Sequence, residues 1–494
     1  MNTYLSKSNY LSGIQCLKKL HKEIYRPGTV APSSPGEDYR FHTGTDVHRI
    51  AFQLFPEAKV IEAPSYKMDE ALNQTELAMQ FGESCIIEGA FHFDGIVIRV
   101  DILREFGPDT CELIEVKSSL APKEVHIQDL ALQKYVLEQN GIIVEKVTVM
   151  CLKKAYEYGD HYDNLFTPFD VTDRVNSEIL PVPTNVAQFR EILSQEEEPQ
   201  IPIGSHCEKP YPCPFKHHCM QDMPTQSIFT IPRISGAKKD HLIQDGVFSI
   251  YDLPDDFPLT EKQGSYVNSI QEGQPQINIP GIQAEMQHLS YPLYFLDFET
   301  LSSPLPRFPG LHPFSRLPFQ FSLHVDDGSG NLSHVEYLHT RRTDPRPNLV
   351  EALLKEIGEV GSIVVYNKTF EQSIIEALAD AVPQYRDRLL GLISRLWDQL
   401  AIFRRHYQHP GFLGSSSLKA VLPVIAPELS YQDLTLQNGN DAAAIWNTII
   451  GLPYCQERER RIEALRAYCH MDTLAMVKIH HHLLGIINSG SLHG

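Results

Sequence analysis

Two groups of acidic residues in this 494-residue chain have the types and spacing expected of divalent-metal sites. In the first, Asp101 is followed after thirteen residues by the tripeptide Glu115-Val116-Lys117. Side chains two apart on a strand share a face, so Glu115 and Lys117 project together, and a hairpin can bring Asp101 beside them. Carboxylate oxygens bind Mg2+ or Mn2+, and Lys117 can orient an attacking water, which suits hydrolysis of a phosphodiester. The alternative interpretation is an ion pair on a solvated strand face.

Three other side chains are candidates for the same site. His48 follows the sequence GTDV on a predicted helix and could supply an imidazole ligand, although a lone histidine is more often structural. Gln133 and Tyr135 lie on the helix that follows the strand pair. Positions two apart on a helix diverge, so we expect only one of these two residues to face the site.

Four cysteines form a second kind of candidate metal site. One lies near the start of the chain, and three lie in a polar, proline-bearing stretch over 196–219, each separated from the next by five residues. They are Cys16, Cys207, Cys213 and Cys219. Four thiolates suit an iron–sulfur cluster, and zinc stays open as the alternative because histidines lie nearby. Reduced buried thiols would be expected in an apolar core rather than in a polar loop.

The second acidic group lies in the C-terminal part of the chain. Asp297 and Glu299 end an apolar strand and share its face, whereas Glu371 begins a helix after another strand. Tyr468 and Asp472 are four apart in a long helical pattern and also share a face. Four carboxylates so close repel one another unless cations neutralise them, and two metal ions held in this way activate water in phosphoryl transfer. Tyr468 could orient that water.

Other interpretations of these acids stay open at this level. Glu299 and Asp472 could be ordinary charges at the edge of a sheet. A glycosidase also uses paired carboxylates, but the sequence shows no sign of a sugar-stacking aromatic cleft. Asp398 and residues 415–419 follow the second motif and are either structural or on the substrate side of the site.

Composition limits the class of protein. The chain has 43 basic and 62 acidic residues and a formal net charge of -19, which excludes an overall basic nucleic-acid coat but not a local basic channel. It has no apolar run of bilayer length and no apolar signal region, so we expect a soluble, cytoplasmic protein without membrane contact. Its nine cysteines are then thiols or metal ligands. An iron–sulfur oxidoreductase is disfavoured because no dinucleotide-binding glycine fingerprint accompanies them.

The elements that must position these residues follow from hydrophobic periodicity. Helices are expected over 3–28, 38–55 and 124–142, and strands over 91–103, 111–119 and 146–154, with a turn at 107–109 between the first two strands. Later strands are expected over 291–300, 319–325 and 362–367, followed by helices after Thr369. These patterns predict an α/β domain over 1–225, a helical connector over 226–285 and a second α/β domain over 286–494.

The N-terminal motifs together resemble those of RecB-like PD-(D/E)XK nucleases that carry an iron–sulfur cluster, known from CRISPR adaptation and bacterial end resection. The motifs are GIQCLKKL, GTDVH, RVD, IEVK, the helix with Gln133 and Tyr135, and the three C-terminal cysteines, over roughly residues 1–222. The resemblance implies Mg2+ or Mn2+ at His48, Asp101 and Glu115, catalysis aided by Lys117 and Gln133, and a 4Fe-4S cluster on the four cysteines. The chain departs from the family pattern in the five-residue gap between the first two cysteines of the trio and in the close spacing of the Gln and Tyr.

The C-terminal motifs DxE, NxxFE and YxxxD resemble those of the DnaQ-like DEDD 3'-5' exonucleases of the RNase H-like fold, in the subtype with a tyrosine. This resemblance covers about residues 290–485. It implies metal binding by Asp297, Glu299, Glu371 and Asp472, with Tyr468 acting on the nucleophile. Glu371 stands where the family generally has Asp.

Both resemblances combine into one expectation. The chain resembles a bacterial family that fuses an iron–sulfur RecB-like domain to a DnaQ-like domain, so the expected fold is α/β, with a restriction-endonuclease-like PD-(D/E)XK domain and an RNase H-like DEDD domain joined by a small helical connector. The expected function is that of a metal-dependent nuclease with two phosphodiester-hydrolysing sites, an exonuclease that processes DNA ends. The alternative is a nucleic-acid-binding or iron–sulfur sensing protein in which one or both sites are degenerate.

Overall fold

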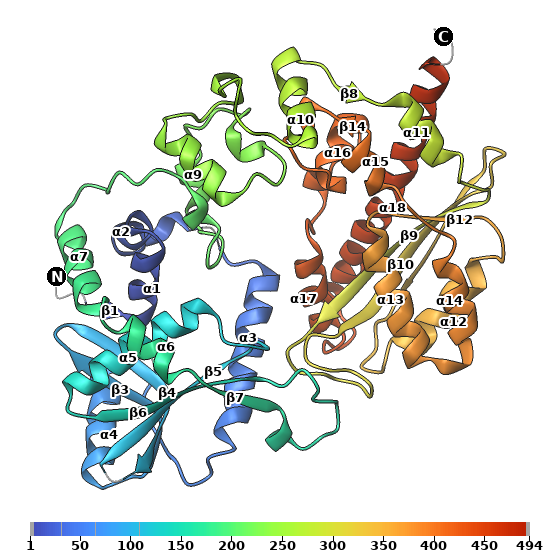
Figure 1. The fold of residues 1–494 in the computed structure, drawn as a ribbon. Coiled ribbons are helices and arrows are strands. Elements are labelled where there is room, and N and C mark those ends of the chain that lie inside the picture. Colours follow the sequence, from blue (N-terminus) through green and yellow to red (C-terminus); the bar gives the residue numbers. More distant parts are fainter. Residues whose placement is uncertain (1–3, 31, 65, 108, 491–494) are drawn as a thin grey trace. The chain divides into compact units, whose positions relative to one another are not determined.

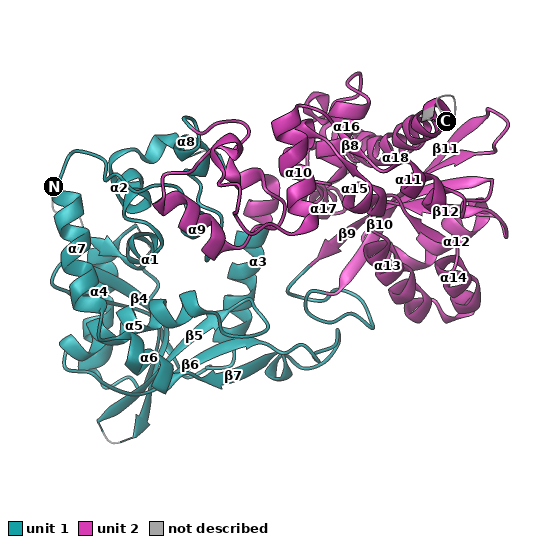
Figure 2. Ribbon diagram, turned by 45° about the horizontal axis from the view of Figure 1, so that its top comes forward, with its two compact units in different colours: residues 1–33, 40–222, 303–314 teal, residues 34–39, 223–302, 315–494 magenta. Residues whose placement is uncertain are grey.

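The computed structural model describes residues 4–30, 32–64, 66–107 and 109–490. The chain divides into two compact units, which Figure 2 distinguishes by colour. Unit 1 comprises residues 1–33, 40–222 and 303–314, and unit 2 comprises residues 34–39, 223–302 and 315–494. Both units combine helices with a β-sheet (Figure 1), which confirms the predicted α/β class.

Unit 1 contains, within the described ranges, a seven-stranded sheet in the order β2-β3-β4-β5-β6-β7, with β1 beside β4. Its strands are β1 (Leu5–Ser6), β2 (Lys59–Val60), β3 (Cys85–Phe93), β4 (Ile96–Gly107), β5 (Thr110–Lys117), β6 (Ile143–Leu152) and β7 (Phe166–Asp170). β4 is antiparallel to β3 and β5, whereas β5 and β6 are parallel. A parallel pair needs a long crossover, and helix α5 (Glu124–Gln139) provides it.

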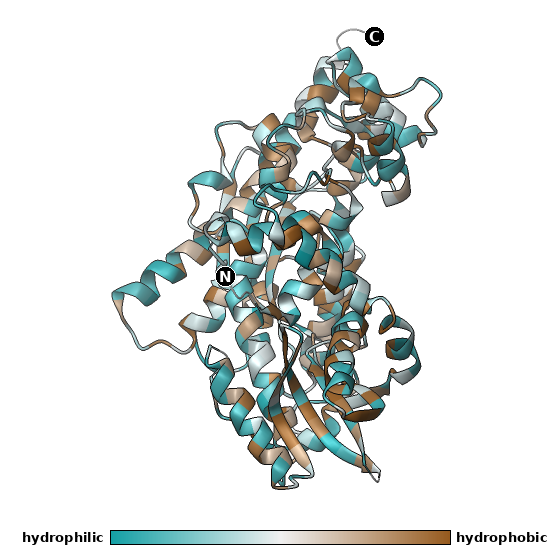
Figure 3. Cartoon of the chain, turned by 90° about the vertical axis from the view of Figure 1, so that its left-hand side faces the viewer, coloured by the Kyte–Doolittle hydropathy of each residue, from teal (hydrophilic) through white to brown (hydrophobic). Residues whose placement is uncertain are grey.

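Hydrophobic cores cover both faces of this sheet. Along β6, Val147 and Val149 belong to one core and Met150 and Leu152 to another, as the alternation of side chains on a strand requires. Figure 3 shows hydrophobic stretches along the strands. The remaining helices of this part are α1 (Lys7–Gln15), α2 (Leu17–Tyr25), α3 (Pro35–Phe52), α4 (Met68–Gln80), α6 (Thr172–Glu178), α7 (Val182–Ser194) and α8 (Lys216–Cys219). The first core lies against α1, α5 and α7, and the second lies against α3.

Two local predictions in unit 1 are wrong. The segment 91–103 is not one strand, because Asp94 and Gly95 adopt positive φ angles of 44° and 70° and turn the chain between β3 and β4. An Asp-Gly pair favours this two-residue turn, but the apolar residues on both sides resemble a continuous strand. The helix expected over 3–28 is interrupted at Cys16, whose extended backbone separates α1 from α2. Thr3 and Pro108, which fall in the predicted elements, lie outside the described residues.

Unit 2 is organised around a sheet that, in the part of the chain described, has five strands in the order β11-β10-β9-β12-β13. The strands are β9 (Leu293–Ser302), β10 (Arg316–Asp326), β11 (Leu332–Leu338), β12 (Ser362–Val365) and β13 (Leu396–Asp398). β9, β10 and β11 are antiparallel neighbours, whereas β12 is parallel to both β9 and β13. The strands expected over 291–300, 319–325 and 362–367 are confirmed by β9, β10 and β12.

Helices pack on both faces of this second sheet (Figure 1). On one face, Tyr294, Leu296 and Phe298 of β9 pack against α12 (Arg346–Glu356), α13 (Lys368–Ala381) and α14 (Arg386–Ile393). On the other face, Leu293 and Phe295 pack against the long helix α18 (Gln456–Gly490), beside which lies α17 (Gly439–Ile449). The odd-numbered residues of β9 therefore face α18.

Residues 226–285 cluster with unit 2 and are not a compact unit of their own, unlike the separate connector expected from composition. Helices α9 (Gly236–Gln244) and α10 (Glu261–Glu272) enclose a small core around Ile250 and Tyr266. After them, β8 (Gln276–Ile277) pairs with β14 (Tyr407–Gln408), and helix α11 (Ile279–Met286) follows. The sequence carried no signal for this pairing because β8 and β14 are only two residues long. Residues 303–314 cluster instead with unit 1, where Leu305 and Phe314 pack on the core beside α3.

The other elements of unit 2 that bear on function are helices α15 (Leu400–Arg405) and α16 (Leu418–Ile425). Among the described residues, no helix combines the length and the apolar content required to traverse a membrane.

Candidate functional site

The hairpin of β4 and β5 positions the first acidic group. Its antiparallel register pairs Ile102 with Ile114, and Asp101 and Glu115 are the next residues on the two strands. Asp101 Oδ2 accepts a hydrogen bond from the backbone N–H of Val116 at 2.8 Å. Lys117 Nζ donates to Glu115 Oε1 at 2.6 Å, as two side chains on one strand face can. The structure thus brings together Asp101, Glu115 and Lys117, the three residues selected from their spacing in the sequence.

Two residues that the sequence analysis did not select complete this cluster. Lys7 Nζ lies 3.2 Å from Glu115 Oε1 and 3.3 Å from Asp129 Oδ1. Lys117 Nζ lies 3.1 Å from Asp129 Oδ2. Asp129 lies four residues before Gln133 on α5, so helical spacing could have identified it. Lys7 had no such signal, because it is 108 residues from Glu115 in the sequence.

Gln133 is the member of the predicted Gln and Tyr pair that faces the cluster. Its Nε2 donates to Glu115 Oε2 at 2.9 Å and to Asp129 Oδ1 at 3.0 Å. Tyr135 instead packs against Phe93, with ring centroids 6.0 Å apart. The expectation that only one of the two residues faces the site is therefore confirmed.

The environment of this cluster shifts the pKa values of Glu115 and Asp101 in opposite directions. Burial favours the neutral form of Glu115, but the ammonium groups of Lys117 and Lys7 outweigh it and hold the pKa of Glu115 well below its usual value. Burial, followed by the charge of Glu115, raises the pKa of Asp101 to about 6. Glu115 is therefore a carboxylate at neutral pH, and two half-buried ammonium groups lie beside it.

His48 lies near Asp101, with Nδ1 3.8 Å from Asp101 Oδ1. Glu88 joins them: one ligand atom from each of His48, Glu88 and Asp101 lies within 4.8 Å of the others. Glu88 has a positive φ of 61° at an irregular position in β3, between the paired residues Ile87 and Gly89. A regular alternation of strand residues does not predict this position, which is why Glu88 was missed. The structure places Glu115 with the lysines and places His48 with Glu88.

The four cysteines selected from the sequence line one small pocket in unit 1. Cys16 lies at the junction of α1 and α2, and the N–H of Cys213 donates to the carbonyl of Cys207 at 2.8 Å. Burial raises the pKa of Cys213 and of Cys219, and their cysteine neighbours raise it further. Three lysines share the pocket, namely Lys18, Lys19 and Lys22. Four thiols at one place, with cations beside them, fit a thiolate-bound metal group, because such a group removes the thiol protons and carries negative charge.

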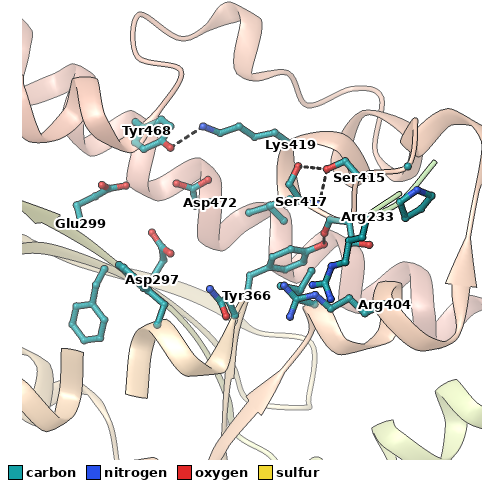
Figure 4. A pocket seen from close by; sticks show the side chains of 18 of the residues that line it. Arg233, Asp297, Glu299, Tyr366, Arg404, Ser415, Ser417, Lys419, Tyr468 and Asp472 are labelled. Atoms are coloured by element: carbon teal, nitrogen blue, oxygen red, sulfur yellow. Dashed lines mark hydrogen bonds between the residues drawn. The ribbon is translucent and has the colours of Figure 1, made fainter. Parts of the chain in front are cut away.

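Three of the four acids of the second group, Asp297, Glu299 and Asp472, line a cavity of about 630 Å³ in unit 2. Asp297 and Glu299 lie on the face of β9 that α18 covers, and Asp472 lies on α18. In Figure 4, these three carboxylates point into the same space. Cys469, which was not selected, adds a thiol 3.8 Å from Asp297 Oδ2. One ligand atom from each of Asp297, Glu299 and Cys469 lies within 4.8 Å of the others.

Two hydroxyl groups border these carboxylates. Tyr468 OH accepts a hydrogen bond from Lys419 Nζ at 3.0 Å (Figure 4). Tyr431 OH donates to Asp472 Oδ1 at 2.5 Å. Burial, followed by the charge of Asp472, raises the pKa of Tyr468, so its hydroxyl keeps its proton. Lys419 belongs to the 415–419 segment, which lines the cavity. Tyr431 had no signal in the sequence.

The carboxylates of the cavity repel one another in the absence of a cation. Burial and the charge of Asp472 raise the pKa of Glu299 to about 8, and burial raises the pKa of Asp472 to about 6. Burial and the neighbouring acids hold the pKa of Asp297 well above its usual value. A divalent cation bound among these oxygens would favour their ionised forms, so this donor set fits Mg2+ or Mn2+.

Glu371 differs from the other three predicted ligands, because it is not among the residues that line the cavity. Its side chain is 2% exposed, and Oε2 has no hydrogen-bond partner among the described residues. Burial raises its pKa to about 8, and its charge in turn contributes to the raised pKa of Asp297. Asp398 has a structural role, since its Oδ1 accepts from the N–H groups of Asn367 and Leu400 at 3.1 Å each.

Cations line another side of the same cavity. Arg233 and Lys262 come from the segment expected to be a connector, and Arg404 comes from α15. Burial, together with the charges of Arg233 and Arg404, lowers the pKa of Lys262. In Figure 4, Arg233 and Arg404 lie across the cavity from Asp297 and Glu299, with Ser415 and Ser417 beside them. None of the three cations was selected from the sequence, because they are isolated charges in segments without a motif.

Comparison with known proteins gives limited matches. A family described as "Domain of unknown function (DUF2779)" matches residues 294–417, a range that includes Asp297, Glu299 and Glu371. Uncharacterized protein UU173 of Ureaplasma parvum serovar 3 is 25% identical over 264 residues, which cover 48% of this chain and 37% of that protein. Uncharacterized protein MG366 homolog of Mycoplasma pneumoniae is 29% identical over 215 residues, which cover 39% of this chain and 32% of that protein.

This chain spans about a third of the length of the curated relatives it matches. Among solved structures, that of SSO0001 is 13% identical to this chain, and the match covers 45% of this chain and 89% of that one. Its TM-score is 0.22.

Proposed function

We propose that this protein is a metal-dependent nuclease that processes DNA ends in the cytoplasm, with its main hydrolytic site in the cavity of unit 2. The observation that carries this proposal is the distribution of charge around that cavity. Three carboxylates gather on one side, and Arg233 and Arg404 lie on another (Figure 4), close enough to Lys262 to lower its pKa. A phosphodiester bound to metal ions needs both, because the metals require acidic ligands and the neighbouring phosphates require positive charge.

The side chains of the cavity divide into three roles. Asp297, Glu299 and Asp472 hold Mg2+ or Mn2+, which when bound supplies Lewis-acid charge and lowers the pKa of a coordinated water. The protonated hydroxyl of Tyr468, held by Lys419, orients the attacking water at the scissile phosphate. Arg404 and its cationic neighbours bind the phosphates that flank the cleaved bond, where paired N–H groups match phosphate oxygens.

The proposal includes two fold assignments. Unit 2 is proposed to be an RNase H-like DEDD domain, supported by the mixed sheet with Asp297 and Glu299 on its central strand. Unit 1 is proposed to be a restriction-endonuclease-like PD-(D/E)XK domain, supported by the hairpin that joins Asp101 to Glu115 and by the crossover helix that carries Gln133.

Unit 1 is proposed to hold a second hydrolytic site and a 4Fe-4S cluster. His48, Glu88 and Asp101 offer donors for a divalent cation. The ammonium groups of Lys7 and Lys117 lie beside them and can stabilise negative charge that develops on a phosphate. The four cysteines hold the cluster, which would join the start of unit 1 to its end and restrain the unfolded chain.

Cleavage of end-labelled polymers tests the proposal. The intact chain is incubated with single- and double-stranded DNA and RNA in Mg2+, in Mn2+ and in chelator. We expect metal-dependent release of nucleotides from DNA ends. Arg404→Ala should weaken binding of the DNA and lessen its dependence on salt. The matched control is Arg405→Ala on the same helix, because the Arg405 side chain is 62% exposed and pairs with Glu285.

The position of Glu371 favours one alternative. With this acid off the cavity wall, the site could be degenerate and the protein could bind nucleic acid without cutting it, or sense through its cluster. If the protein binds DNA but shows no metal-dependent cleavage of any of the four polymers, this alternative is established and the nuclease proposal is overturned.

A further inference from the structure

Three histidines of unit 2 form a cluster that the proposed hydrolytic site does not use. His324 of β10 and His334 of β11 are directly opposite each other in the antiparallel ladder, so their side chains share one face of the sheet. Helix α18 packs on that face and contributes His470. The three ring centroids lie 4.4 to 4.9 Å apart. One ring nitrogen from each histidine lies within 4.8 Å of the others.

The surrounding hydrogen bonds leave lone pairs available on two of these rings. Thr473 Oγ1 donates its only proton to the carbonyl of His470 at 3.1 Å. It therefore accepts from His324 Nδ1, which lies at 2.8 Å, and from Ser322 Oγ, which lies at 2.7 Å. Because Ser322 Oγ has donated its own proton, it accepts a hydrogen bond from His334 Nε2 at 2.9 Å.

This is the one arrangement of donors that makes all four hydrogen bonds at once, and it assigns both tautomers. His324 carries its proton on Nδ1 and His334 carries its proton on Nε2, which leaves Nε2 of His324 and Nδ1 of His334 unprotonated. Hydrogen bonds to the distal nitrogen in this way are what fixes the orientation of metal-binding histidines. Burial, followed by the neighbouring imidazoles, lowers the pKa of His324 to about 3 and that of His334 to about 4, so both rings stay neutral.

The donor set indicates the class of metal. Three imidazoles suit zinc and similar transition metals, whereas Mg2+ prefers carboxylate, carbonyl and water oxygens. Zn–N bonds of about 2.0–2.1 Å in a tetrahedron place nitrogen atoms about 3.4 Å apart, so side-chain rotations must draw together the three rings, of which one nitrogen each already lies within 4.8 Å of the others. Glu336, two residues from His334 on the same strand, is paired with Arg466 at 3.1 Å. Three histidines then leave the fourth position to water.

We propose that His324, His334 and His470 bind one zinc ion that joins helix α18 to the hairpin of β10 and β11. His470 lies between Tyr468 and Asp472 in the sequence of α18. A zinc ion at this point fixes the turn of α18 that carries both residues of the hydrolytic cavity. It is a positioning site, separate from the carboxylates that hold Mg2+ or Mn2+.

Counting zinc in the intact chain tests this proposal. The protein is stripped with chelator and dialysed against Zn2+ with excess Mg2+, so that the carboxylate sites are occupied by Mg2+. Bound zinc is then measured by atomic absorption in the wild type, His334→Ala and His470→Ala. The cysteine pocket contributes equally to all three proteins, so each variant should bind about one zinc fewer than the wild type. The matched control is His481→Ala on the same helix, which should keep the full count.

Two further measurements keep the proposal falsifiable if alanine variants fold poorly. His334→Gln is a milder change that can keep the hydrogen bond to Ser322, and it should also lose the zinc. Co2+ bound to the wild-type chain should add the visible bands of a tetrahedral, nitrogen-bound ion, measured as the difference from the His334→Ala protein, which carries the same cysteine pocket. Equal zinc counts in the wild type and both folded variants, or a cobalt difference spectrum without these bands, would overturn the proposal.

Discussion

Crowding of negative charge in the cavity of unit 2 should destabilise the metal-free protein as the pH rises. The perturbation is Glu299→Gln, which removes the charge and keeps the shape of the side chain. Burial and Asp472 raise the pKa of Glu299 from 4.5 to about 8. Between these two values the folded chain holds a proton that the unfolded chain has lost, so the free energy of unfolding falls as pH rises.

The magnitude follows from the two pKa values. A pKa unit corresponds to about 1.36 kcal/mol, which sets an upper limit of about 4 to 5 kcal/mol on the loss between pH 4.5 and pH 8. We expect about 2 to 3 kcal/mol, because Asp472 can accept a proton when Glu299 loses one and so relieves the repulsion. For a unit of this size, each kcal/mol shifts the melting temperature by about 2 °C. Glu299→Gln should therefore melt about 4 to 6 °C above the wild type at pH 8, with almost no difference near pH 4.5.

The assay is calorimetry in chelator at a series of pH values. Comparing variant with wild type cancels the titration of the histidines, which is common to both proteins. Glu376→Gln, an exposed change on α13, serves as control and should melt with the wild type at every pH. Added Mg2+ should raise the melting temperature of the wild type more at pH 8 than at pH 5, because binding requires the ionised acids. If wild type and Glu299→Gln lose stability in parallel from pH 5 to pH 8, the carboxylates are not crowded and the metal-site geometry is wrong.

Three further predictions concern the remaining sites. Cys213→Ala should lose both iron and acid-labile sulfide and lower the melting temperature of unit 1, because a cluster restrains a long loop; stoichiometric zinc without sulfide in the wild type would refute the cluster. Lys117→Ala should abolish one pattern of cleavage products and Asp297→Ala another, as gels of end-labelled DNA would show, whereas identical loss from either change would indicate a single composite site. Tyr468→Phe should reduce turnover by about 10²- to 10⁴-fold at unchanged metal affinity, since only the orienting hydroxyl is removed. Its control is the exposed Tyr454→Phe, and an unchanged rate in Tyr468→Phe would make that tyrosine a packing residue.

Short-range spacing was sufficient to select residues that one element presents together. Glu115 and Lys117 are two apart on a strand, and Tyr468 and Asp472 are four apart on a helix, so backbone geometry sets which face they share. The same kind of pattern identified the α/β class and the strands β9, β10 and β12. It failed at the turn of Asp94 and Gly95, where apolar residues on both sides hid a change of direction.

Only the tertiary structure decided which distant segments of the chain come into contact. Lys7 reaches Glu115 because β1 and α1 lie against β4, and Arg233 reaches the carboxylate cavity because residues 226–285 pack onto unit 2. Glu371 has the position expected along the chain, yet burial of its helix takes it off the cavity wall. The physical reason is that backbone geometry constrains neighbours within about one or two turns of the chain, whereas contacts between distant segments depend on how helices and sheets bury their apolar faces. The sequence by itself therefore determined the kinds of chemistry available to this protein, and packing determined which side chains can act together.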